Sequence, residues 1–156
     1  DDAMETGGSV IASTSLSPLG RRRDAVAGFD YFLLSHPESV SENGGLALFS
    51  DIQEGDEIVL MEGSEDNLVH RAPRVAENAL EMARLDKEHI SGALVIYCAG
   101  CMLTVQDRMT EVATGLRDVL GGKPFLGTFT FGEQGCFIGG SNHHGNLMIS
   151  VVVFGV

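Results

Sequence analysis

The stretch that decides the fold is Gly92–Glu133, which reads GALVIYCAGC over residues 92–101 and PFLGTFTFGE over residues 124–133, with a helical pattern between them. An uninterrupted apolar run such as residues 92–97 is typical of a strand that is buried on both faces. The order strand, helix, strand predicts that the two strands lie side by side and parallel, so that their carboxyl ends meet at one edge of a sheet. We therefore expect the functional site at that edge.

The remaining elements are predicted from periodicity and from turn residues. The pattern predicts an α+β or mixed α/β fold, with about six strands in one mixed sheet and two long helices packed on it. A helix capped by Ser64 contains Pro73, which is expected either to kink it or to delay its start to near Arg71. The other expected elements are a strand over 25–35 ended by His36-Pro37, a turn at 43–45, a hairpin of strands 46–50 and 57–62 around Glu54-Gly55-Asp56, a helix over 105–120 ended by Gly121-Gly122, and a last strand over 147–154.

The length and composition predict one globular domain. A chain of 156 residues with 44% hydrophobic and 21% charged residues can bury a core of its own. Residues 1–23 are rich in Ser, Gly and Thr and include a Pro18–Gly20 turn, so we expect a lead-in arm or linker there. The domain itself is expected over residues 24–156.

The charge balance disfavours two classes of partner. The net charge is −12, whereas contacts to nucleic-acid phosphates or anionic lipids need clustered Lys and Arg. The basic cluster Arg21–Arg23 follows a turn and is interpreted as a solvated loop, with a partner site as the alternative. The longest clean apolar run, Leu147–Val156, is too short to span a bilayer. We therefore expect no nucleic-acid partner and no membrane.

Two features favour a cytoplasmic location. No charged segment followed by an apolar segment opens the chain, so no signal peptide is expected. Three cysteines is an odd number, which argues against a disulfide framework and for a reducing compartment. The chain begins with Asp rather than Met, so we interpret it as a fragment or a processed product.

The cysteines permit several chemistries that the sequence leaves open. Cys98 and Cys101 form a CxxC pair, which is either a redox pair activated by a helix N-terminus or two buried, unreactive thiols. With Cys136 and His143 (or His144) they have the ligand types of a tetrahedral zinc site. A Cys–His nucleophile is a further alternative, with Glu133 as its only nearby carboxylate.

Polar groups cluster at the two predicted strand ends and in the loop that follows them. Glu133 lies among glycines, and we interpret it as a ligand-binding carboxylate, with a solvated turn residue as the alternative. We expect Glu133→Ala to leave folding intact because it is placed at a surface edge. We also expect residues 97–101 and 132–136 to be neighbours, with the His143 loop folded over them. The candidate ligand-binding residues are Tyr97, Cys98, Cys101, Glu133, Gln134, Asn142, His143 and His144.

The chain resembles the C-terminal half of the FIST family, the F-box and intracellular signal transduction sensory module. The resemblance rests on these stretches: Pro18–Gly20, Ser35–Pro37, Phe49–Glu62, Gly92–Gly100, Gly127–Glu133 and the His143 loop. It implies a non-enzymatic, cytoplasmic input domain that senses a small ligand such as an amino acid and that works with an N-terminal half. Some family members resemble haem-binding nitric oxide sensors. The cofactor of this chain is left open: none is expected, and haem and zinc stay as alternatives.

The chain departs from the family pattern at two positions. Cys101 stands where the family often has Arg after Cys-Ala-Gly, and His143-His144 stands where the family tends to have His-Asn. The first departure weakens the expectation of an anionic ligand, because a guanidinium is the usual partner of a carboxylate.

Overall fold

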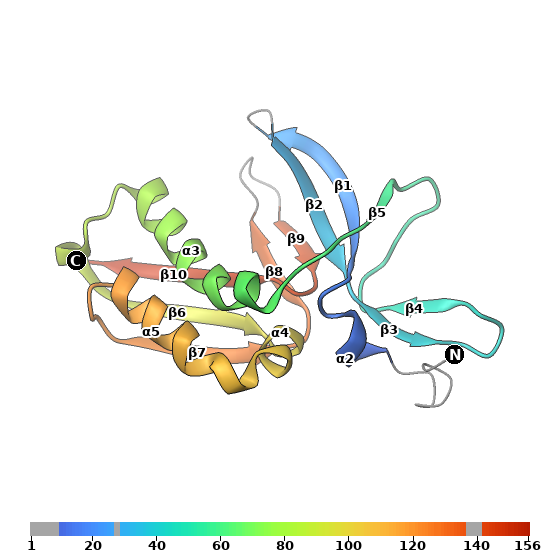
Figure 1. Ribbon diagram of the computed structural model, residues 1–156. Coiled ribbons are helices and arrows are strands. Elements are labelled where there is room, and N and C mark those ends of the chain that lie inside the picture. The colour runs from blue at the N-terminus through green and yellow to red at the C-terminus, as the bar shows by residue number, and fades with distance from the viewer. Residues whose placement is uncertain (1–9, 27–28, 137–141) are drawn as a thin grey trace. The chain divides into compact units, whose positions relative to one another are not determined.

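The computed structural model describes residues 10–26, 29–136 and 142–156 (Figure 1). These residues form two compact units. The first unit contains the chain up to Gly63 together with Phe131–Met148, and the second contains Ser64–Thr130 together with Ile149–Val156. The protein is an α+β protein, as the sequence predicts, and each unit is described by itself.

The second unit is built on a three-stranded sheet of order β10-β6-β7. Its central strand, β6 (Ile90–Cys98), pairs in parallel with β7 (Phe125–Thr130) and antiparallel with β10 (Ile149–Gly155). Cys98 lies opposite Thr130, so the carboxyl ends of β6 and β7 meet at one edge. The predicted parallel pairing of these two strands is therefore confirmed.

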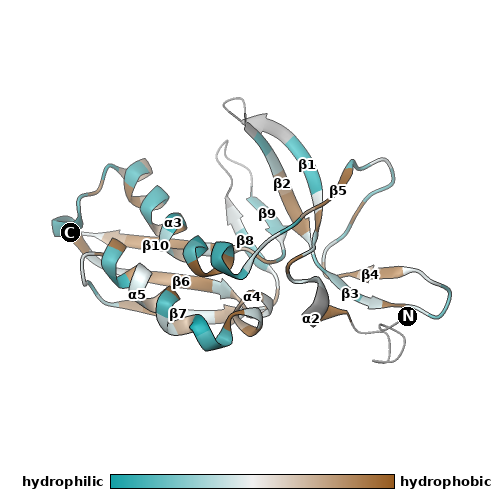
Figure 2. Ribbon diagram, in the orientation of Figure 1, coloured by the Kyte–Doolittle hydropathy of each residue, from teal (hydrophilic) through white to brown (hydrophobic). Residues whose placement is uncertain are grey.

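The helices α3 (Glu65–Ala83) and α5 (Met109–Val119) pack against each other in this unit, and α3 also lies along β10 (Figure 1). Side chains alternate along a strand, so one face of β6 presents Ala93, Val95 and Tyr97, all buried. The core cluster joins this face to both helices through Leu80, Ile90, Ala93 and Leu120. Figure 2 shows the hydrophobic colour along β6 and both colours on α3, as an amphipathic helix requires.

Helix α3 begins where the sequence predicts. The Ser64 hydroxyl accepts a hydrogen bond from the N–H of Asn67 at 3.2 Å, and Glu65 and Asp66 lie in the first turn. The helix continues through Pro73, so the alternative that it starts near Arg71 is wrong. It ends at Arg84, which has the positive φ of 51° that closes many helices.

The second helical segment is shorter than expected. Cys98 is followed by α4 (Ala99–Thr104) and by a 3-10 helix, η2 (Gln106–Arg108), before α5 begins. The predicted glycine stop is confirmed, since Gly121 and Gly122 have positive φ values of 63° and 76°. A further 3-10 helix, η1 (Lys87–His89), leads into β6.

The first unit contains three small sheets among the described residues. The largest has the order β2-β1-β5, with β1 (Leu19–Val26) between β2 (Phe29–Ser35) and β5 (Ile58–Leu60). The strands β3 (Pro37–Val40) and β4 (Leu46–Leu48) pair across the predicted turn at 43–45, and β8 (Glu133–Cys136) pairs with β9 (Asn142–Gly145). A short helix, α2 (Ile11–Thr14), precedes β1.

Several fold predictions are corrected here. One six-stranded sheet is wrong, because the described strands form two three-stranded and two two-stranded sheets. The hairpin over 46–62 is also wrong, since β4 pairs with β3 whereas β5 pairs with β1. The segment expected to be an arm contains α2 and the start of β1. The patterns locate short strands, but the pairing of a three-residue strand depends on contacts distant in sequence.

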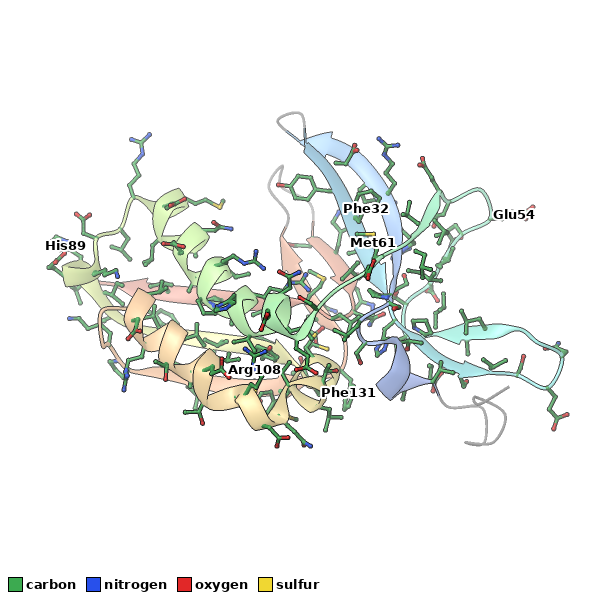
Figure 3. All side chains as sticks on the ribbon, viewed as in Figure 1. Phe32, Glu54, Met61, His89, Arg108 and Phe131 are labelled. Carbon is green, nitrogen blue, oxygen red and sulfur yellow. The ribbon has the colours of Figure 1, made fainter. Side chains whose placement is uncertain are left out.

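Gly20 lies at a closely packed position of this sheet. A Cβ on Gly20 would lie 2.9 Å from the Sδ of Met61 and 3.3 Å from the Cβ of Phe32. Figure 3 shows the side chains of Phe32 and Met61 side by side in the first unit. The bare backbone of Gly20 therefore leaves room for both side chains over the middle strand.

Candidate functional site

The β8–β9 hairpin brings five of the predicted ligand-binding residues together. Its register pairs Glu133 with Gly145, Gln134 with His144, and Gly135 with His143. Directly opposed residues point to the same face of a sheet, and the faces alternate along each strand. Gln134, Asn142 and His144 therefore share one face of the hairpin, where all three side chains are exposed. Glu133 and His143 belong to the other face.

Glu133 is a buried carboxylate that accepts a backbone hydrogen bond, and it is not exposed to solvent. It is 1% exposed, and its Oε2 accepts a hydrogen bond from the N–H of Met148 at 3.2 Å. The contact holds the turn after β9, in which Leu147 has a positive φ of 55° and is buried. This φ is unusual for a bulky side chain and needs support from its surroundings. The expected surface position of Glu133 is therefore wrong, and Glu133→Ala is now predicted to destabilise the fold because it removes a buried acceptor.

Asn146 fastens the hairpin to strand β2. Its N–H donates to the carbonyl of Leu34 at 3.0 Å, and its Oδ1 accepts from the N–H of His36 at 3.1 Å. His36 is buried, its Nε2 donates to the carbonyl of Ile11 at 3.1 Å, and burial lowers the pKa of its imidazole. This polar contact explains why an amide and an imidazole are tolerated in the interior.

His144 is positioned over a glycine. A Cβ on residue 132 would lie 2.6 Å from Nε2 of His144, and Gly132 has a φ of +88°. A larger residue at this position would be strained and would displace the imidazole. Gly132 thus leaves room for the His144 side chain.

The other candidate residues, Tyr97, Cys98 and Cys101, lie in the second unit. Tyr97 is 2% exposed, and its hydroxyl donates to the carbonyl of Leu68 at 3.1 Å. Burial, assisted by nearby Cys101, raises the pKa of this phenol. Cys98 ends β6, Cys101 lies in the first turn of α4, and both are buried thiols. All three residues therefore have packing roles within the unit.

The predicted neighbourhood of residues 97–101 and 132–136 joins residues of different units, and it stays a prediction. The zinc alternative also stays open, because the Cys136 side chain lies outside the described residues. Within the part of the chain that is described, no three His, Cys, Asp or Glu side chains are grouped so that they could hold a metal ion. Residues 137–141 of the expected loop are likewise outside that part.

A shallow groove of about 310 Å³ lies between α3 and α5. Its acid Glu111 accepts from Nε and Nη2 of Arg108, both at 2.9 Å, and these hydrogen bonds lower the pKa of the Glu111 carboxyl. Arg108 also donates to Asp66 at 2.7 Å, so it connects the two helices (Figure 3). The groove is lined by Val69, His70, Pro73, Thr110, Glu111, Thr114, Gly115 and Asp118.

The burial of Arg21 differs from the sequence-based expectation. The pattern predicts a solvated basic loop, yet Arg21 lies in the middle strand β1 and is 7% exposed. Alternation places Leu19, Arg21 and Arg23 on one face of a strand and Gly20 and Arg22 on the other, but it does not separate the buried Arg21 from the exposed Arg23. Three consecutive arginines obscured that pattern.

Comparison of the sequence with models of known protein families identifies the family of this chain. The model of the FIST C domain matches residues 4–136. The chain belongs to the FIST C domain family. This FIST C domain is accordingly a sensory-type domain of signal transduction. The matched residues include all of strands β6, β7 and β8. No curated protein and no solved structure is significantly similar to it. None of the described helices is long and apolar enough to cross a membrane.

Proposed function

We propose that this FIST C domain binds a small polar ligand, such as an amino acid, as the input step of a cytoplasmic signalling protein, without catalysing a reaction. The observation that carries the proposal is the exposed face of the β8–β9 hairpin. Gln134, Asn142 and His144 present amide and imidazole groups there. Such groups donate and accept hydrogen bonds with polar ligands. The N-terminal half of the same protein is the proposed partner.

Hydrogen bonds at the base of the hairpin support the same proposal. The side chains of Glu133 and Asn146 accept hydrogen bonds from backbone N–H groups at its base, and Gly132 leaves room for the imidazole of His144. A ligand that meets preorganised groups loses less conformational entropy on binding. Burial of Cys98 and Cys101 supports a non-enzymatic role, since reactive cysteines are partly exposed and lie in electropositive surroundings.

A thermal-shift screen tests the proposed function. The chain is heated with each amino acid, with small organic acids and with haem, and a ligand of the native state raises the melting temperature. We expect His144→Ala and Gln134→Ala to reduce the shift without changing the melting temperature of the unliganded protein. Asp107→Asn, an exposed substitution in the second unit, is the control and should keep the full shift.

Two results would contradict the proposal. If no compound of the panel raises the melting temperature, the chain is not a small-ligand sensor of this kind. If a ligand binds but the two hairpin variants behave like the control, the ligand contacts another surface.

A further inference from the structure

Arg21 lies in the middle of a sheet and its side chain is enclosed. It is opposite Leu33 of β2 and opposite Ile58 of β5, so neighbouring strands flank it on both sides. It is 7% exposed, although arginine is seldom buried unless its charge is paired. A charge in this place needs a specific reason.

Within the described residues, the guanidinium of Arg21 has no hydrogen-bond partner. Its Nε is fully buried and unpartnered. The nearest carboxylate oxygen, Oδ2 of Asp56, is 3.8 Å from Nη1, which exceeds hydrogen-bond length. That oxygen already accepts the N–H of Gln53 at 2.9 Å. A buried polar group without a hydrogen-bond partner lowers the stability of the folded state. Each such group in a native structure therefore requires an explanation.

The neighbouring Arg22, in contrast, is paired with two acidic side chains. Its Nη2 donates to Asp30 at 2.9 Å and its Nη1 to Glu57 at 3.3 Å, on the exposed face. The chain carries 22 acidic residues against 10 basic ones, so the incomplete pairing of Arg21 does not come from a shortage of carboxylates. The exposed Arg22 is hydrogen-bonded to two carboxylates, whereas the Nε of the buried Arg21 has no such partner among the described residues.

The nearby carboxylates do not offset the effect of burial on the charge of Arg21. Burial is the largest influence and lowers the pKa of its guanidinium, and the positive charge of Arg23 acts in the same direction. Asp56 and Asp51 oppose them and do not compensate fully. An anion at the buried Nε edge would remove the remaining cost.

We propose that Arg21 binds the carboxylate group of the ligand of this sensory domain. The guanidinium is a planar fork that matches a carboxylate with two parallel hydrogen bonds, and an unused Nε provides one of the two donors. This inference rests on the proposed function and names the group that would recognise an acidic ligand or the carboxylate of an amino acid. It gives the chain a guanidinium clamp although position 101 is Cys.

The experiment observes Arg21 directly. The ¹H–¹⁵N signal of its Nε–H is assigned by its absence in Arg21→Met, and is followed during titrations with acetate, glycine, glycinamide and inorganic phosphate. We expect saturable movement with acetate and glycine and none with glycinamide, which lacks a carboxylate. Arg21→Met should weaken glycine binding about tenfold to a hundredfold, as loss of charge-assisted hydrogen bonds does. Arg22→Met, which replaces the neighbouring arginine that already pairs with two acids, is the matched control and should bind as the parent does.

The unliganded variants give a second readout. If Arg21 serves a ligand, replacing an unpaired buried cation by an apolar side chain should leave the melting temperature unchanged or raise it. If Arg21 holds the sheet together, Arg21→Met should melt earlier than the parent, and the inference is overturned.

The other outcomes are also decisive. An Nε–H signal that none of the probes moves, or glycine binding that is equal in Arg21→Met and the parent, overturns the inference. Movement with phosphate alone overturns the carboxylate assignment. A ligand from the thermal-shift panel that binds Arg21→Met normally leaves the sensory function standing and removes only the role of Arg21.

Discussion

Tyr97 has a structural role that its hydroxyl group does not reveal in the sequence. The phenol is buried on the helix-facing side of β6 and donates to the carbonyl of Leu68 in α3. The bond joins a strand to a helix across the core of the second unit. Burial also raises the pKa of the phenol, because the phenolate would lose its hydration.

Replacing Tyr97 by Phe should lower the free energy of unfolding by about 1 kcal/mol at neutral pH, the usual value for one buried hydrogen bond. Equilibrium unfolding in urea measures it. Ser91→Ala is the control, because the Ser91 hydroxyl donates to the carbonyl of Phe154 in an exposed position and should matter less. Equal losses in the two variants would mean that the Tyr97 bond does not gain from burial.

The same pair of proteins should differ in pH dependence. The folded pKa of Tyr97 lies above the unfolded value of about 10, so its stabilising effect is complete below about pH 10 and is lost as pH rises toward the folded pKa. The advantage of the parent over Tyr97→Phe should therefore shrink above that pH in urea titrations. A constant difference from pH 8 to pH 11, a range of about 3 units around the reference value, would contradict the burial of the phenol.

The contact between α3 and α5 depends on a glycine facing a proline. A Cβ on Gly115 would lie 2.6 Å from Cγ of Pro73, which is closer than real Cβ atoms approach. Pro73 lacks the N–H that a helix interior uses, so its presence within Glu65–Ala83 is costly in isolation. The ring is accommodated because the partner helix has no side chain at the crossing point.

Gly115→Ala should destabilise the protein by about 1–3 kcal/mol through overpacking, although alanine favours a helix more than glycine does. Chemical denaturation of the single variant, of Pro73→Ala and of the double variant measures the coupling. The double variant should recover most of the loss, because the smaller side chain leaves space for the added methyl group. Additive effects would show that the helices do not touch at these two residues.

The whole chain carries more negative charge than its ion pairs neutralise. At a net charge of −12, mutual repulsion opposes the compact state, and dissolved salt screens it. The described ion pairs of Arg22 and Arg108 are largely at the surface and offset this repulsion only in part.

The melting temperature should therefore rise as sodium chloride is added from low to physiological concentration, over which the screening length falls to about 8 Å. Differential scanning calorimetry measures it, with equal osmolarity of sucrose as the control for non-ionic effects. A melting temperature that falls with salt would indicate that the ion pairs outweigh the net repulsion.

Local features of this protein could be predicted from sequence alone. The buried strand ending at Cys98, the Ser64 cap, the strand end before His36-Pro37 and the glycine stop at Gly121-Gly122 are all found in the structure. Each is set by neighbours within a few residues, through apolar periodicity, hydrogen-bond donors or backbone freedom. The family resemblance rests on the same local motifs and is confirmed by the family match.

Long-range pairing and burial were decided by the tertiary structure. Strand β5 pairs with β1 rather than with β4, and this places Arg21 between two strands instead of in solvent. The hairpin β8–β9 buries Glu133 and exposes its neighbour Gln134, although both residues are polar. Short strands of similar composition can pair in several ways that are nearly equal in local free energy. The packing of distant segments therefore selects one arrangement and, with it, which polar side chains are buried and which are exposed.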